Sequence, residues 1–199
     1  MEKLKDIDDV CQPDIRQKYL VILDKEEGQA RYIELRDYHK AASRIPLHDG
    51  VPEDVRNHFA TAQNLLVYSW FYYPFNVSAQ LQALASVEFA LKIKAGLRFA
   101  PNGRPPGLKQ LLEKAIKENW ISDDNFSEIR QMKEQASGKL SFNTIEGKLV
   151  ENYTETLKES LPKLRNMLAH GDSILHGQGA TWVWICAELI NQLFEPSDS

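Results

Sequence analysis

Apolar residues recur at three- and four-residue steps along most of the chain from Pro52 onward, which is the spacing of one face of an α-helix. The first run extends to Trp70, and Pro74 then ends or kinks it, because proline removes a helical hydrogen bond. Further runs lie at about Asn76–Phe99, Leu108–Asn119, Asp123–Ala136, Lys148–Ala169 and Ala180–Phe194. The pattern predicts an all-α fold, a bundle of about five main helices that forms one domain over residues 51–195.

Residues 1–50 carry a less regular pattern. The segment PDIRQKYLVILDKEEG is compatible with a helix opened by Pro13. On that helix one side would be apolar, with Ile15, Tyr19, Ile22 and Leu23. The same run, paired across Gly28 with ARYIEL, is also compatible with a β-hairpin. We prefer the helix and expect residues 1–50 to form a helical extension packed on the main domain, separated from it by the loop IPLHDGVPED.

The composition is that of a globular protein: 199 residues, of which 43% are hydrophobic and 26% charged. No apolar run approaches the roughly 20 residues of a membrane span, and MEKLKDIDDV lacks the apolar core of a secretion signal. Cys11 and Cys186 lie far apart and have no metal-binding spacing, so we interpret both as reduced thiols. These features predict a cytoplasmic protein without a membrane anchor, a metal or another cofactor.

The segment LRNMLAHG carries the residues most suggestive of chemistry. Arg165 offers a planar fork of donors for phosphate oxygens, and His170 can accept or release a proton near neutral pH. Asn166, directly after the arginine, can orient either side chain or bind a sugar hydroxyl. The alternative is structural, because the helix dipole alone favours Arg and His near a helix C-terminus.

Helical geometry separates this trio from the core. Pro162 suits the first turn of a helix and Gly171 suits its C-terminal cap. At about 100° per residue, one face is apolar, with Leu161, Leu164, Met167 and Leu168. Asn166 and His170 fall on the nearly opposite face, and Arg165 lies on the flank between them. We therefore expect Leu164 and Leu168 to pack inward on the Ala79–Leu97 helix, with the polar trio pointing away from the core.

Other polar residues add support around the trio. Glu88 lies on a largely apolar helix and needs a partner, for which Arg165 and Lys92 are both suitable. Asp172 is a second supporting residue. The net charge of −4 argues against a general nucleic-acid binder, but Lys158 and Lys163 provide local positive charge for RNA.

The remaining candidates favour structural roles. His170, Asp172 and His176 lack a spacing that would aim them at one metal ion. Three isolated histidines fit surface positions or satisfied polar contacts: His39, His48 and His58. The aromatic run YSWFYYPF at residues 68–75 could stack on bases, but aromatic residues at helical spacing more often form a core or an interface.

Three segments together resemble the HEPN superfamily of small all-α domains, many of which are metal-independent endoribonucleases. The Arg165-Asn166-x3-His170 motif in KLRNMLAHG resembles its Arg-x(4–6)-His signature in the restrictive form, with a polar residue after the arginine. AQLQALASVEFALKIKAGL (Ala79–Leu97) and GLKQLLEKAIKENWIS (Gly107–Ser122) are similar to its earlier helices. The resemblance covers about residues 52–195. Many HEPN toxins carry a tyrosine two residues after the histidine, where this chain has Asp172.

The resemblance implies a homodimeric endoribonuclease with Arg165, Asn166 and His170 as catalytic residues, acting as a toxin or a defence protein. It also implies an antitoxin partner such as a small nucleotidyltransferase. One alternative is a non-catalytic HEPN module that binds a nucleotide or a partner protein through Arg165 and His170. A further alternative is a structural dimer with the trio buried in its interface.

Overall fold

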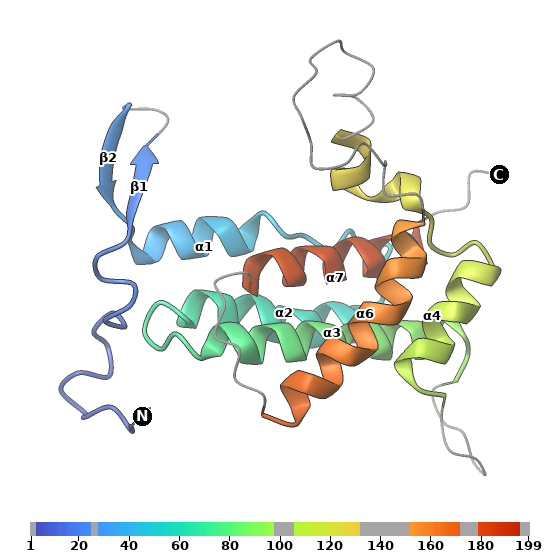
Figure 1. Cartoon of the computed structure of the whole chain (residues 1–199), viewed down its shortest axis with the longest axis horizontal. Coiled ribbons are helices and arrows are strands. Elements are labelled where there is room, and N and C mark those ends of the chain that lie inside the picture. Colours follow the sequence, from blue (N-terminus) through green and yellow to red (C-terminus); the bar gives the residue numbers. More distant parts are fainter. Residues whose placement is uncertain (1–2, 25–27, 98–105, 132–151, 172–178, 196–199) are drawn as a thin grey trace.

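The computed structural model describes residues 3–24, 28–97, 106–131, 152–171 and 179–195, which are mostly helical and include a small two-stranded sheet (Figure 1). Its helices are α1 (Leu35–Ser43), α2 (Glu53–Tyr68), α3 (Phe75–Lys94), α4 (Leu108–Lys117), α6 (Tyr153–Ala169) and α7 (Gly179–Phe194). A 3₁₀ turn over Asp123–Asn125 and a helical stretch over residues 127–131 lie between α4 and α6. The predicted α-rich bundle is confirmed.

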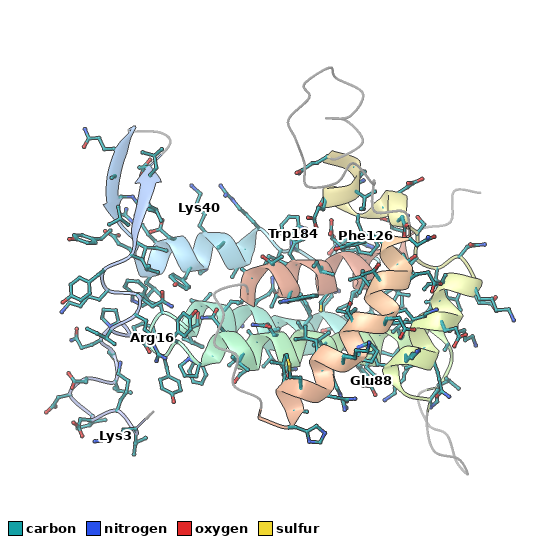
Figure 2. The ribbon with its side chains drawn as sticks, viewed as in Figure 1. Lys3, Arg16, Lys40, Glu88, Phe126 and Trp184 are labelled. Carbon is teal, nitrogen blue, oxygen red and sulfur yellow. The ribbon has the colours of Figure 1, made fainter. Side chains whose placement is uncertain are left out.

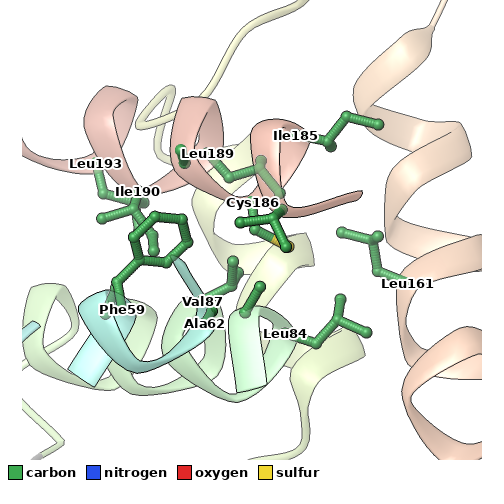
Figure 3. Packing of buried hydrophobic residues seen from close by; sticks show 14 of the residues in the cluster. Phe59, Ala62, Leu84, Val87, Leu161, Ile185, Cys186, Leu189, Ile190 and Leu193 are labelled. Carbon is green, nitrogen blue, oxygen red and sulfur yellow. The ribbon is translucent and has the colours of Figure 1, made fainter. Parts of the chain in front are cut away.

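Helix α3 lies at the centre of the bundle, in contact with α2, α4, α6 and α7. Its alanine- and leucine-rich sequence is apolar on several sides, as expected for a helix surrounded by others. Figure 3 shows the core: Phe59 and Ala62 from α2, Leu84 and Val87 from α3, Leu161 from α6, and Cys186, Leu189 and Ile190 from α7. Burying each large side chain contributes about 1.5–3 kcal/mol, so packing on α3 fixes the positions of the outer helices.

The predicted helix boundaries hold with small changes in the described residues, whereas the predicted end at Ala136 and the predicted start at Lys148 lie outside them. Pro52 and Pro74 are the N-cap residues of α2 and α3, so the break expected at Pro74 is confirmed. Helix α3 ends at Lys94, before the predicted end at Phe99, and Gly96 follows with φ of 71°. Glycine, which has no Cβ, adopts that left-handed conformation without steric strain and commonly follows the end of a helix.

The helix that we predicted for residues 13–28 is wrong, and the alternative prediction of a β-hairpin is right. Strands β1 (Val21–Asp24) and β2 (Gln29–Tyr32) pair antiparallel, with Ile22 opposite Arg31. Arg31 bonds Asp24 at 2.9 Å and Asp37 of α1 at 2.7 Å, which ties the hairpin to α1. The apolar side expected for a helix stays in solvent, since Leu23 is 67% exposed.

One buried amide on α3 lacks hydrogen-bond partners. Gln80 is 0% exposed, and neither its Nε2 nor its Oε1 bonds any described residue. An unsatisfied buried polar group costs about 1–3 kcal/mol, so Gln80→Met should raise the free energy of unfolding by about that amount. Denaturant unfolding measures the change.

Gln63→Met is the matched control for this substitution. The Gln63 amide donates to the Ile45 carbonyl at 2.8 Å, so its loss should destabilise the protein. A destabilised Gln80→Met variant would show that the Gln80 amide makes favourable bonds in solution.

Candidate functional site

Helix α6 carries the candidate residues and crosses α3 and α4 at one side of the bundle (Figure 1). Leu168 is buried and Leu164 is partly buried against the core, whereas Asn166 and His170 are exposed. The guanidinium-bearing side chain of Arg165 is 44% exposed. The predicted orientation of the helix is therefore confirmed: its leucines face inward and the polar trio reaches solvent.

The start of α6 is fixed by a carboxylate from a distant segment. Asp123 accepts hydrogen bonds from the backbone N–H groups of Tyr153, at 2.9 Å, and Thr154, at 2.8 Å. Burial alone would raise the pKa of Asp123, but the bonds from Thr154 and Tyr153 outweigh it and lower the pKa. Sequence reasoning missed this cap, because Asp123 follows α4 and nothing local links it to Tyr153.

Pro162 lies inside α6, so its prediction as a first-turn residue is wrong. The helix begins nine residues earlier, at Tyr153, and runs through the proline to Ala169. The predicted end is confirmed: His170 is the C-cap residue, and Gly171 follows with φ of 81°. This ending places the His170 ring beside the partly negative C-terminus of the helix.

Glu88 forms ion pairs with both of the partners expected for it, Lys92 and Arg165. Its Oε1 lies 2.6 Å from Lys92 Nζ, and its Oε2 lies 3.7 Å from Arg165 Nη2. The side chain is 18% exposed, and Figure 2 shows it where α6 crosses the central helices. On its other side the Arg165 guanidinium donates to Asn166 Oδ1 at 3.4 Å. Glu88 and Asn166 therefore both orient Arg165 while leaving much of its surface in solvent.

The His170 imidazole makes no hydrogen bond or ion pair with the part of the chain that the structure describes. Five residues separate it from Arg165, which corresponds to about 7.5 Å along the helix axis. The two side chains therefore leave the helix more than one turn apart.

The two candidate RNA-binding lysines differ in their surroundings. The side chain of Lys158 is 15% exposed and pairs with Glu155, and this pairing raises the pKa of Lys158. Lys163 is exposed. Lys158 lies two turns before Arg165, and Lys163 two turns before His170, each about 10 Å away along the axis. Lys163 is thus the better placed of the two to meet a polyanion.

Some sequence candidates lie elsewhere. Asp172 and His176 lie outside the described residues. His48 is held by Asn191 and by the Gly50 N–H, and His58 bonds Ser86 at 2.8 Å, so both have the predicted satisfied polar role. In the described ranges no group of three potential metal ligands comes together, and no described helix is long and apolar enough to cross a membrane.

Comparison of the chain with protein families, with curated proteins and with solved structures found no match. The functional assignment therefore depends on the geometry of α6.

Proposed function

We propose that the protein is a metal-independent endoribonuclease of HEPN type. The observation that carries the proposal is the exposure of Arg165, Asn166 and His170 at one end of α6, with the guanidinium oriented by Glu88. An oriented guanidinium and an exposed imidazole on the same helix suit a phosphodiester, which presents anionic oxygens and needs proton transfer.

The chemistry follows from RNA itself. The 2′-hydroxyl oxygen attacks the adjacent phosphorus and the bond from phosphorus to the 5′-oxygen breaks, leaving a 2′,3′-cyclic phosphate and a 5′-hydroxyl. His170 removes the proton from the 2′-hydroxyl or supplies one to the leaving oxygen. Arg165 stabilises the negative charge that develops on the phosphate oxygens. Asn166, which already accepts a bond from Arg165, keeps that guanidinium in place.

Cleavage requires both a base and an acid, whereas each chain supplies one histidine in this motif. Two-fold pairing of α6 with its copy would place two Arg/Asn/His sets in one cleft. The exposed outer side of α6 supports this arrangement, because no described residue covers Asn166 or His170.

The activity is tested by incubating the purified protein with single-stranded RNA in EDTA. We expect cleavage that leaves cyclic phosphate ends, and no cleavage of DNA of the same sequence, which lacks the 2′-hydroxyl. Tight RNA binding without cleavage would instead identify a non-catalytic binding module. Cleavage that needs an added divalent metal would overturn the mechanism.

The composite site predicts a dimer whose activity needs both histidines. Light scattering should give twice the 22.8 kDa of one chain at micromolar concentration. Adding excess His170→Ala chain should then lower the activity per wild-type chain, because most wild-type chains would be paired with a chain lacking the histidine. A monomer, or activity per wild-type chain that stays constant in the mixture, would rule out the composite site.

Glu88→Gln tests whether the carboxylate orients Arg165. We expect the maximal cleavage rate to fall by less than about tenfold, because a partly exposed ion pair contributes about 1 kcal/mol. The KM for RNA should change little, since removing the negative charge also removes repulsion of phosphate. Glu155→Gln, which removes the partner of Lys158, is the control and should leave the maximal rate unchanged. Equal losses in the two variants would exclude a specific role for Glu88.

A further inference from the structure

The N-terminal region holds most of the apolar surface that the described part of the chain exposes. Ten of its twelve exposed large hydrophobic residues lie between positions 4 and 35. Figure 1 shows strands β1 and β2 projecting from the bundle at the start of α1. Large apolar side chains gathered in one exposed region mark an interaction surface, so this hairpin is a candidate docking element.

The hairpin has one apolar face, and that face is turned to solvent. Its exposed members pair across the two strands, Val21 with Tyr32 and Leu23 with Ala30. The opposite face carries Arg31, whose ion pair with α1 fixes which side of the hairpin faces the bundle. The apolar face therefore makes no contribution to the core of the same chain.

The outer edge of β1 also leaves backbone groups without partners. The Ile33 N–H donates to the Leu20 carbonyl at 2.9 Å, so these two residues form a hydrogen-bonded pair. Hydrogen-bonded and non-hydrogen-bonded pairs alternate along antiparallel strands, so the N–H and C=O groups of Val21 and Leu23 point away from β2. They bond no described residue outside the hairpin. Backbone donors and acceptors in this arrangement match another extended strand.

This edge lacks the features that usually prevent strands from pairing with their own copies. Exposed edges commonly carry a lysine, a proline or a bulge, whereas Val21, Ile22 and Leu23 form an uninterrupted apolar run. The edge of β2 differs, because the Arg31 guanidinium donates to the outward Tyr32 carbonyl at 3.1 Å. The open edge of the hairpin is therefore that of β1.

A second copy of β1 fits this edge in one symmetric register. With a two-fold axis at Ile22, Val21 of each chain exchanges two backbone hydrogen bonds with Leu23 of the other, which uses every outward group of β1. Each of these cross-strand pairs joins apolar side chains, and Asp24 lies opposite Leu20, so like charges do not meet. The pairing converts a two-stranded hairpin, which is marginal alone, into a four-stranded sheet.

We infer that the outer edge of β1 pairs antiparallel with the same edge of a second copy of this chain. The contact is smaller than the roughly 1,200–2,000 Å² of stable interfaces, so the association is weak and depends on concentration. The inference does not rest on the nuclease proposal, because the hairpin and α6 are separate elements. If chains also pair through α6, edge pairing links those dimers into larger species.

Light scattering on the unchanged protein measures the association. The mean mass should at least double between micromolar and millimolar concentration, and it should fall again on dilution. A mass that stays constant over that range would overturn the inference. RNA cleavage is measured separately, so failure of either proposal leaves the other testable.

Cysteine cross-linking tests the register on the full chain. In a Cys11→Ser background, where the remaining Cys186 is buried, Ile22→Cys should form a disulfide-linked dimer under mild oxidation. The reason is that the two residues of a non-hydrogen-bonded pair have Cα atoms about 4.5 Å apart, within reach of a disulfide. Ala30→Cys is the matched control: Ala30 is more exposed than Ile22, but it lies on β2, at least about 14 Å from its copy in this register. No linkage at Ile22, or equal linkage at Ala30, would overturn the register.

Two further variants separate edge pairing from burial of the apolar face. Leu23→Pro removes an outward N–H of β1 and no bond between the two strands, so it should abolish the rise in mass. Tyr32→Lys places a charge on the apolar face and leaves the β1 edge intact, so association should stay within about threefold of the wild type. Association that survives Leu23→Pro, or that is lost in Tyr32→Lys alone, would overturn pairing through the β1 edge.

Discussion

His170→Ala should lower the rate of RNA cleavage by about 10²–10⁴-fold, the usual contribution of a positioned proton-transfer group. The free energy of unfolding should stay within about 0.5 kcal/mol, as for other exposed side chains without structural contacts. His170 is exposed and bonds no residue that the structure describes, so its loss removes chemistry without removing packing. Single-turnover cleavage and denaturant unfolding, measured on the same preparation, separate the two effects.

His39→Ala provides the matched control, because His39 is an exposed histidine of α1, away from the motif. It should retain the wild-type cleavage rate. Cleavage that survives His170→Ala would remove the histidine from the mechanism, and equal losses in the two variants would indicate a nonspecific effect.

Arg165→Ala should be at least as damaging as the histidine substitution, with a loss from about 10²-fold upward, as when a donor to a developing oxyanion is removed. The loss should appear in the maximal rate more than in KM, because the guanidinium acts on charge that develops in the transition state. Arg165→Lys should recover little of the rate, since an ammonium group lacks the planar fork. Steady-state kinetics on a defined RNA oligonucleotide measures both quantities.

Arg36→Ala is the control for removal of one positive charge. Arg36 lies on α1 with its side chain 71% exposed and pairs with Glu34, away from the motif. Its loss should leave the maximal rate unchanged. An Arg165→Lys variant with the wild-type rate would show that the site uses positive charge alone and has no need of bidentate geometry.

The helical bundle was predictable from sequence because each main helix buries a continuous apolar face. In α6, the spacing of Leu161, Leu164 and Leu168 determines which side packs inward, and the exposure of Asn166 and His170 follows. A face of this kind is a local property of the sequence, and it survives in the folded protein because the core selects it.

The N-terminal segment was not predictable in the same way. Its apolar residues never enter the core: Val21 is 58% exposed and Leu23 is 67% exposed. Its conformation depends instead on Arg31, which pairs with Asp24 across the hairpin and with Asp37 on α1. Helix α1 lies within the extension that we expected to be helical, but its bounds were not predicted, because its hydrophobic pattern is short and Ala42 is its one buried residue.

The candidate site shows the same division between local and distant information. The motif residues and their orientation follow from the helix, and Glu88 was recognised as a residue that needs a partner. Glu88 pairs with Lys92 on its own helix, whereas its contact with Arg165 depends on how α6 crosses α3. The Asp123 cap joins segments far apart in the sequence, so no local pattern could indicate it.

The central claim is that the protein cleaves RNA through attack by the 2′-hydroxyl of its substrate. The direct test is an RNA oligonucleotide with a mapped cleavage position, in which the single nucleotide on the 5′ side of that bond is replaced by its 2′-deoxy form. In EDTA, cleavage of that bond should fall to background, while other cleavable bonds of the same strand are cut at their usual rate. Continued cleavage at the 2′-deoxy position would contradict the mechanism proposed for Arg165 and His170.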